Sequence, residues 1–287
     1  MKILLTGVTG QVGFELKRSL QTLGEVIAVE RAQLDLSDLD QVRDVVRQVK
    51  PGLIVNAAAY TLVDKAESEP ALAHRINAEA PAVMAAEALR LGCRMVHYST
   101  DYVFDGSKQE PYLETDAVNP VNVYGRSKLA GEQAIAAAGI PHLILRTSWV
   151  YGLKGKNFLL TMLRLASERS ELRVVADQHG APTWSRTIAD TTAAILHRGE
   201  SGGAQWWECN SGIYHLSSQG QTTWAGFTEA IIAQAKLDCT VVPITSAEYP
   251  TPAKRPFNSV LCSDKLRERF CDIPDWNTAL SLCLEHR

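Results

Sequence analysis

Short apolar runs alternate with longer, partly polar segments through the first half of the chain. The apolar runs cover residues 2–6, 25–29, 53–55, 94–99 and 142–145. Runs of this length are typical of strands that are buried on both faces of a parallel sheet. The segments between them have the spacing of amphipathic helices. This alternation predicts an α/β fold, a Rossmann-like, doubly wound parallel sheet with helices on both faces.

The helices of this half have recognisable ends. An apolar stripe over residues 12–23 predicts the first helix, which ends at Gly24. Ser37 is expected to cap the second helix, because a serine hydroxyl accepts hydrogen bonds from the first helical turn. An alanine-rich helix is expected over residues 71–91, with a kink at Pro81.

The pattern is less regular after residue 152, where we expect a smaller lobe. Helices are predicted over residues 157–166, 186–197 and 223–235, strands over 172–175, 214–216 and 241–244, and a loop over 199–203. Residues 153–287 are expected to form mainly a smaller α/β substrate-binding lobe that closes over the sheet edge, with 176–198 returning to the first domain. A cleft between two lobes is a favoured position for a small-molecule site.

The composition narrows the classes of partner. The chain has 287 residues, of which 46% are hydrophobic and 21% charged, and its net charge is −3. This balance gives no reason to expect a nucleic-acid or membrane partner. The apolar run at the N-terminus is too short for a signal peptide or a membrane span. The six cysteines form no CxxC pair, so we expect reduced thiols in a cytoplasmic protein.

A glycine-rich turn follows the first predicted strand at once. Gly7, Gly10 and Gly13 are spaced three apart and lead into the first helix, with Gln11 and Val12 between the last two. Such glycines let the backbone approach a pyrophosphate, whose charge is favourable at a helix N-terminus. Glycines also mark plain turns, but the position directly after a buried strand favours a dinucleotide site. Residues 1–152 are therefore expected to form an NAD(P)-binding domain.

The end of the second predicted strand leaves the choice of cofactor open. An acidic residue at this point accepts hydrogen bonds from the adenosine ribose, whereas a basic one suits a 2′-phosphate. Here Glu30 and Arg31 are adjacent, and Asp35 and Leu36 follow in the same part of the site. A solvated charged pair is an equal alternative for Arg31. The sequence thus predicts NADPH or NADH without choosing between them.

Three small residues follow the third predicted strand. Ala57, Ala58 and Ala59 leave room for a flat group to lie against the backbone. Small residues that serve only helix–strand packing are the alternative. In open parallel sheets, ligands bind at the edge formed by the carboxyl ends of the strands.

A tyrosine and a lysine are placed for proton transfer. Tyr124 is the only one of eight tyrosines with a lysine, Lys128, four positions later. On a helix this spacing puts both side chains on one face, and the ammonium should lower the pKa of the phenol. Thr100, at the end of the fourth predicted strand, is expected beside them. A chance pair on an exposed helix face is the alternative; the glycine turn and the alanines favour a reductase site.

Several longer motifs resemble one family. They are STDYVFDG at 99–106, NVYGRSK at 122–128, RTSWVYG at 146–152, DQHGAPT at 177–183 and PTPAKRPFNS at 250–259. Together with the glycine turn, they resemble the dTDP-4-dehydrorhamnose reductases among the extended short-chain dehydrogenase/reductases. The resemblance implies reduction of the 4-keto group of dTDP-4-dehydro-β-L-rhamnose by NADPH or NADH. The product would be dTDP-β-L-rhamnose, a precursor of bacterial surface polysaccharide.

The resemblance also implies a role for particular residues. Tyr124 would donate the proton, Lys128 would hold the nicotinamide ribose, and Thr100 would hydrogen-bond the carbonyl oxygen. The residues that it implies for the nucleotide sugar are Val63, Asp101, Tyr102, Trp149, Arg255 and Asn258. Arg255 would bind the diphosphate, with support from Asn258. A buried core tryptophan and a solvated surface arginine are the alternatives for Trp149 and Arg255.

Two positions depart from the family pattern. Some members dimerise around a magnesium ion held by carboxylates, for which this chain supplies Glu15, but Arg186 stands where another carboxylate is expected. Arginine would repel a cation, so Mg²⁺ is doubtful, no metal ligand is assigned, and both monomer and homodimer remain open. Thr9, in the glycine turn, offers no charge to a 2′-phosphate.

Two other functions remain as alternatives. One is another nucleotide-sugar epimerase, dehydratase or reductase of the same fold. A dehydratase commonly has an Asp-Glu pair after the active-site threonine, whereas Asp101 is followed here by Tyr102. The other is a non-catalytic regulatory subunit, like the β subunit of methionine adenosyltransferase, which the intact Thr100, Tyr124 and Lys128 disfavour.

Overall fold

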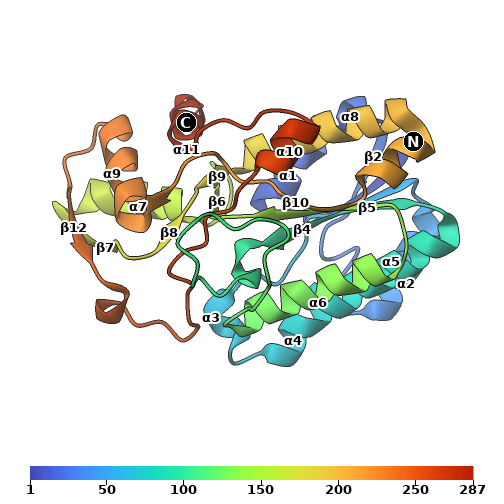
Figure 1. Ribbon diagram of the computed structural model, residues 1–287, viewed down its shortest axis with the longest axis horizontal. Coiled ribbons are helices and arrows are strands. Elements are labelled where there is room, and N and C mark those ends of the chain that lie inside the picture. Colours follow the sequence, from blue (N-terminus) through green and yellow to red (C-terminus); the bar gives the residue numbers. More distant parts are fainter. Residues whose placement is uncertain (287) are drawn as a thin grey trace.

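A parallel six-stranded sheet forms the centre of the computed structural model, which describes residues 1–286 (Figure 1). Its strand order is β10-β5-β4-β3-β1-β2, so the chain winds outward from β1 in one direction and then in the other. The strands are β1 (Lys2–Thr6), β2 (Glu25–Ala28), β3 (Leu53–Asn56), β4 (Arg94–Thr100), β5 (His142–Thr147) and β10 (Gly212–His215). This arrangement confirms the predicted doubly wound sheet. Neighbouring parallel strands need a crossover connection, and the crossover helices bury both faces of the sheet.

Helices cover both faces of this sheet (Figure 1). One face carries α1 (Gln11–Ser19) and α8 (Ser185–Asn210), which pack on each other. The other carries α2 (Leu39–Val49), α5 (Ala80–Leu91) and α6 (Val123–Ala137). A separate apolar cluster lies beneath each layer, so strand residues alternate between two cores.

A second group of elements lies beyond the carboxyl edge of the sheet. A parallel pair, β7 (Glu171–Val175) with β12 (Thr240–Ile244), packs with α7 (Phe158–Glu168), α9 (Trp224–Ala235) and α11 (Trp276–Glu285) around a third apolar cluster. Short two-stranded pairings join β6 (Val150–Tyr151) to β9 (Thr183–Trp184), and β8 (His179–Gly180) to β11 (Thr222–Thr223). The remaining short helices are η1 (Leu20–Thr22), α3 (Val63–Ala66), α4 (Pro70–His74), η2 (Arg75–Glu79), η3 (Asp101–Val103), η4 (Ser246–Glu248) and α10 (Asp264–Arg269).

The helix expected over residues 71–91 is interrupted by a π-helical turn. Helix α4 ends at His74, η2 forms the π turn, and α5 begins at Ala80 with Pro81 in its first turn. Proline is tolerated there because its missing N–H would have no helical partner. The predicted kink at Pro81 is therefore wrong, and the irregularity lies in η2 before it. This turn directs Asn77 inward, where its amide bonds both backbone groups of Tyr60 and the hydroxyl of Ser127.

Two further expectations are corrected. Asp38, not Ser37, caps α2, because its carboxylate accepts from two amides of the first turn while the Ser37 hydroxyl bonds Asp35. The predicted loop over residues 199–203 is part of α8, which breaks only at Gly203, with φ 62° and ψ −154°. Gly199 lies within this helix, and its missing side chain leaves room for the Trp206 ring, which a Cβ would meet at 3.0 Å.

Strand β10 lies in the main sheet beside β5, although residues 214–216 were expected in the smaller lobe. The return of the chain to this sheet is thus longer than residues 176–198, because α8 and β10 both belong to it. The division into a cofactor-binding domain and a smaller lobe otherwise stays a prediction.

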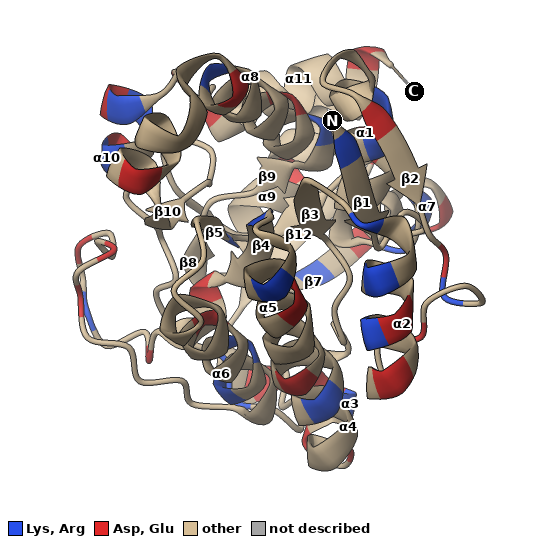
Figure 2. Cartoon of the chain, turned by 90° about the vertical axis from the view of Figure 1, so that its right-hand side faces the viewer, with Lys and Arg blue, Asp and Glu red and all other residues tan. Residues whose placement is uncertain are grey.

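Charged side chains of both signs are interspersed over the surface. Basic and acidic segments alternate along α2, on the side shown in Figure 2. Within the described residues, no helix is long and apolar enough to cross a membrane.

Candidate active site

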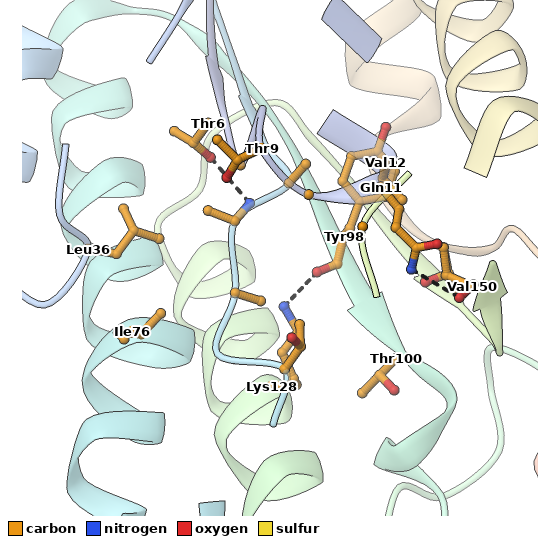
Figure 3. Close-up of a pocket in the computed structure, with 18 of the residues that line it drawn as sticks. Thr6, Thr9, Gln11, Val12, Leu36, Ile76, Tyr98, Thr100, Lys128 and Val150 are labelled. Atoms are coloured by element: carbon orange, nitrogen blue, oxygen red, sulfur yellow. Dashed lines mark hydrogen bonds between the residues drawn. The ribbon is translucent and has the colours of Figure 1, made fainter. Parts of the chain in front are cut away.

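A cavity of about 680 Å³ opens at the carboxyl edge of the main sheet. It extends from the glycine turn after β1, past the ends of β2 and β3, to the end of β4 and the start of α6 (Figure 3). The predicted residues that line it are Gly7, Gly10, Gln11, Val12, Glu30, Arg31, Asp35, Leu36, Ala57, Ala58, Ala59, Val63, Thr100, Asp101, Tyr102, Tyr124, Lys128 and Trp149. The structure thus brings together predicted residues that lie far apart in the sequence.

Only part of the glycine turn borders the cavity. Gly7 has φ +73°, and a Cβ there would lie 2.5 Å from the backbone of Ala57, so no larger residue fits. A Cβ on Gly13 would lie 2.2 Å from the carbonyl oxygen of Gly7, and Gly13 is not among the lining residues. Gly13 therefore allows α1 to approach the turn rather than facing a cofactor itself.

An acidic and a basic side chain lie at the outer end of the cavity. Glu30 and Arg31 are exposed, and the Arg31 Nε lies 3.1 Å from the Asp35 carboxylate. Asp35 also accepts from the backbone and hydroxyl of Ser37, and these bonds, the backbone one first, lower the pKa of its carboxyl. Asp35 is thus an ionised anchor that holds Arg31 at the mouth of the site.

Lys128 reaches from α6 to the end of β4 (Figure 3). Its Nζ donates to the carbonyl oxygen of Tyr98 at 2.6 Å and lies 3.2 Å from Nε2 of His97. Burial lowers the pKa of Lys128 to about 8, although Glu132 acts in the opposite direction.

Tyr124 lies one helical turn before Lys128 and also faces the cavity. Burial raises the pKa of its phenol to about 12, and a hydrogen bond with Thr100 acts weakly against this. The expected lowering of the Tyr124 pKa by Lys128 is therefore wrong for this structure. The reason is that burial dominates and that the lysine amine is directed to β4.

The end of β4 is fixed by its own hydrogen bonds. The Thr100 hydroxyl donates to the Asp101 carboxylate at 3.0 Å and accepts from the Tyr102 amide at 3.2 Å. Ser148 donates to the other carboxylate oxygen at 3.1 Å. Burial raises the pKa of Asp101 to about 6 in spite of these donors. Asp101 is thus held inward as part of the wall of the cavity.

Two tryptophans form one side of the cavity. Trp149 has φ +45°, a strained value for a large residue, and its indole stacks on Trp224 at 3.5 Å with an interplanar angle of 5°. The Trp224 indole N–H donates to Gln178 at 3.2 Å. Both side chains are half-buried and line the cavity, so Trp149 is not a buried core tryptophan.

Some lining residues had no clear signal in the sequence. Trp224 follows Thr223, which caps α9, and nothing in that segment pointed to a site. Lys156 and Asn157 also line the cavity, from the segment before α7. Their neighbour in space, Gln11, bonds the carbonyl oxygen of Val150, and Asn157 bonds Gln11.

Arg255 and Asn258 do not line the cavity. Two nitrogens of Arg255 donate to the two carboxylate oxygens of Asp64, at 2.7 and 2.8 Å. Hydrogen bonding to Arg255 holds the pKa of Asp64 below its usual range. Asn258 is buried and donates to carbonyl oxygens of residues 108–110, so it fixes that loop. Asp64 adjoins Val63, which does line the cavity.

Arg186, the residue expected to disfavour a metal ion, forms an ion pair with Glu15. Nε of Arg186 lies 3.3 Å from the Glu15 carboxylate, and Arg18 approaches the same carboxylate at 3.2 Å. Residues 1–286 contain no group of three or more side chains arranged to hold a metal. Glu15 is thus engaged by two guanidinium groups.

Comparison with known proteins gives one consistent family. Residues 1–287 match the family described as RmlD substrate binding domain. The chain is 52% identical to the dTDP-4-dehydrorhamnose reductase of Burkholderia thailandensis, over 99% of this chain and 98% of that protein. It is 45% identical to the enzyme of the same name from Escherichia coli K12, over 99% and 97%. The crystal structure of dTDP-4-dehydrorhamnose reductase from Bacillus anthracis in complex with NADP superposes with a TM-score of 0.92 at 35% identity, covering 100% and 99% of the two chains.

Proposed function

The chain belongs to the RmlD substrate-binding-domain family of dTDP-4-dehydrorhamnose reductases, and from this premise we propose how it acts. It reduces the 4-keto group of dTDP-4-dehydro-β-L-rhamnose to give dTDP-β-L-rhamnose, with a hydride from NADPH or NADH. The observation that carries the proposal is the single cavity that Thr100, Tyr124 and Lys128 line together with the glycine turn. The predicted family resemblance is confirmed.

The cavity walls fit a nicotinamide dinucleotide. The turn at Gly7–Val12 would receive the pyrophosphate, since any side chain at Gly7 would collide with Ala57 and close the approach. Glu30, Arg31 and Asp35 would hold the adenosine ribose. Ala57, Ala58 and Ala59 would leave room beside it. When bound, the cofactor supplies the hydride.

Proton transfer is assigned to Tyr124. Because burial raises the pKa of Tyr124 to about 12, the phenol is protonated near neutral pH and can donate to the sugar oxygen. Thr100 would hydrogen-bond the same oxygen and stabilise its developing negative charge. Lys128, whose amine reaches from α6 to the end of β4, would hold the nicotinamide ribose.

The nucleotide sugar would occupy the other end of the cavity. The stacked rings of Trp149 and Trp224 offer an apolar wall for the deoxysugar. Val63, Asp101 and Tyr102 face the same space. Arg255 would bind the diphosphate by exchanging the carboxylate of Asp64 for phosphate oxygens, with Asn258 fixing the adjoining loop.

The proposal includes a cytoplasmic location and no metal requirement. The six cysteines are all free, which fits a reducing compartment. The pairing of Glu15 with Arg186 supports a monomer or a homodimer that does not depend on Mg²⁺.

A direct assay tests the function. The purified chain, given dTDP-4-dehydrorhamnose and NADPH, should consume the cofactor and form dTDP-rhamnose, identified by chromatography against a standard. Tyr124→Phe should lower kcat by about 10²–10⁴-fold while the Kd for NADPH stays unchanged. The control is Tyr249→Phe, which removes the hydroxyl of a 63% exposed tyrosine and should not alter kcat. Absence of turnover in the wild type with tight NADPH binding would favour another nucleotide-sugar enzyme or a regulatory subunit.

A further inference from the structure

A buried chain of polar side chains joins the glycine turn to Lys128. The Thr6 hydroxyl donates to Asn56 Oδ1 at 2.7 Å, and Asn56 Nδ2 lies 3.1 Å from His97 Nδ1. His97 Nε2 in turn lies 3.2 Å from Lys128 Nζ. All four residues are at most 2% exposed. Buried polar chains of this kind are retained only when each member is satisfied, so the direction of each hydrogen bond matters.

The backbone settles that direction. The amide of Ala58 is a donor only, and it bonds Asn56 Oδ1 at 3.3 Å and Thr6 Oγ1 at 3.4 Å. The oxygen of the Asn56 side chain therefore faces β1, and its NH₂ group faces the imidazole. His97 Nδ1 must then accept, and a neutral imidazole that accepts at Nδ1 carries its proton on Nε2. Burial, together with the charge of Lys128, lowers the pKa of His97 well below its ordinary value, so the ring is neutral.

We propose that His97 is a positioning residue for Lys128, which Asn56 holds in the tautomer whose Nε2–H faces the lysine nitrogen. The Tyr98 carbonyl holds the lysine nitrogen at the end of β4 in either protonation state, and the imidazole N–H adds a second hydrogen bond when the amine is neutral. The lysine nitrogen can accept from Nε2–H only as the neutral amine, and it donates to the carbonyl in either form. An imidazole N–H at this position thus makes the ammonium a stronger acid than it would be beside an acceptor.

The consequence for catalysis rests on the proposed function. After Tyr124 has given its proton to the sugar oxygen, the phenolate must be protonated again. In that step an N–H bond of the Lys128 ammonium breaks, the O–H bond of Tyr124 forms, and the lysine is left neutral. His97 favours this transfer because its Nε2–H stabilises the neutral amine that results. Burial lowers the pKa of Lys128 to about 8 on its own, and the imidazole N–H would act in the same direction.

Few other ionisable groups face the lysine. On α6, Tyr124 lies one turn before it and Glu132 one turn after, and Glu132 raises the pKa of Lys128. Glu132 is itself bound to Arg146 of β5 by two hydrogen bonds. Beyond β4, Asp101 faces Tyr124. From η2, which packs on α6, the uncharged side chain of Asn77 donates a hydrogen bond to Ser127, the residue before Lys128.

Nitrogen NMR of the histidine-labelled wild type tests the tautomer without substrate. Long-range nitrogen–proton spectra should show His97 protonated at Nε2 and unprotonated at Nδ1 at neutral pH. His142→Gln provides the assignment control. His142 lies at the start of β5, outside the series of polar side chains from Thr6 to Lys128, and it bonds the carbonyl oxygen of Ile140. Finding the proton on Nδ1 would overturn the proposal, since Nε2 would then be an acceptor.

Asn56→Asp supplies the matched variant. A carboxylate at this position only accepts, so the imidazole should move its proton to Nδ1 and offer Nε2 to the ammonium. Carbon NMR of labelled lysine should then show the pKa of Lys128 higher by about one pH unit, and the limb of the kcat–pH profile that belongs to Lys128 should move upward with it. An unchanged Lys128 pKa in a folded Asn56→Asp protein would contradict the proposal. If that variant does not fold, the wild-type tautomer still decides. A chain that shows the expected tautomer but no turnover would overturn the proposed function alone.

Discussion

The guanidinium of Arg255 and the carboxylate of Asp64 form a two-point ion pair between segments that are 191 positions apart in the chain. The pair connects the proline-rich segment near the C-terminus to α3, beside the cavity. Arg255 also donates to the carbonyl oxygen of Ala253, which fixes the turn that carries it. A phosphate that binds Arg255 must therefore compete with a carboxylate that is already in place.

This competition predicts opposite effects for the two partners. Asp64→Asn should lower the KM for the nucleotide sugar several-fold, because Arg255 loses its competing charge. Arg255→Lys should raise that KM about tenfold, because lysine cannot form the bidentate contact. The Kd for NADPH, measured by fluorescence titration, should stay constant in both. A KM unchanged in Arg255→Lys would remove this residue from the diphosphate site. The side chain of Asp64 is 43% exposed, so loss of the pair should cost at most about 1 kcal/mol of stability.

Thr100 should contribute through its hydroxyl alone. Thr100→Val keeps the shape but removes the hydroxyl, which donates to Asp101 here and would turn to the reacting oxygen when substrate binds, so kcat should fall about 10²–10³-fold. Thr100→Ser keeps the hydroxyl and should retain most of the activity. Steady-state kinetics of the two variants make the comparison, with circular dichroism to check the fold. Equal losses in both would show that packing at the end of β4, rather than the hydrogen bond, is what matters.

Arg31 should decide the preference between the two cofactors. The side chain is 77% exposed, is paired with Asp35, and lines the part of the cavity where we propose that the adenosine ribose binds. Arg31→Ala should weaken NADPH binding about tenfold, the loss expected for one charge-assisted hydrogen bond, and leave NADH binding unchanged. Calorimetric titration with each cofactor measures the two constants. A parallel loss for both cofactors would mean that Arg31 does not contact the phosphate.

Asp101 should make stability depend on pH. Its folded pKa of about 6 lies above the ordinary value of 3.8, so the folded state holds this proton more tightly than the unfolded state does. The contribution of Asp101 to stability is full below pH 4 and is lost as the pH rises through 6. Asp101→Asn, which cannot ionise, should therefore be more stable than wild type above pH 6, by about 3 kcal/mol, with no difference below pH 4. Urea unfolding at several pH values would measure this; a gain that is independent of pH would contradict it.

The buried ion pair between Glu132 and Arg146 should dominate the stability of the sheet interior. Both side chains are 2% exposed, and Nη1 of Arg146 has no hydrogen-bond partner within the described residues. Glu132→Gln leaves a buried guanidinium without a counter-charge and should cost about 3–5 kcal/mol in the free energy of unfolding. The matched control is Glu168→Gln in the exposed pair with Arg164, which should cost less than about 0.5 kcal/mol. Similar costs for the two variants would show that burial of the first pair is not decisive.

The sequence was most informative where one local pattern determines the structure. All of the apolar runs become strands, and all but the edge strand β2 are largely buried on both faces. Because strand ends in a parallel sheet meet at one edge, Gly7, Ala57, Thr100 and Tyr124 could be predicted to converge. Their convergence can be predicted from the topology of the sheet alone, without knowing which side chains pair with each other. The choice of Asp38 over Ser37 as the cap was less accessible, because both residue types cap helices equally well.

Long-range pairing could not be predicted in the same way. Nothing near Arg255 in the sequence indicates that Asp64 binds it, and nothing near Trp224 indicates that its ring stacks on Trp149 beside the cavity. The pKa of Tyr124 follows from how deeply the finished structure buries it, whereas the sequence shows only that a lysine lies one turn away. Such properties belong to the assembled fold rather than to any segment.

The π-helical turn at Arg75–Glu79 is equivalent to one inserted residue in an otherwise continuous helix. Deleting Asn77 would restore regular winding, because the extra residue is accommodated within this one turn and the helix on either side keeps its faces. The side-chain amide that bonds Tyr60 and Ser127 would be lost with it, and the start of α6, which carries Tyr124, would lose that brace. A shorter and more regular helix would thus be obtained at the expense of the packing around the helix that carries Tyr124.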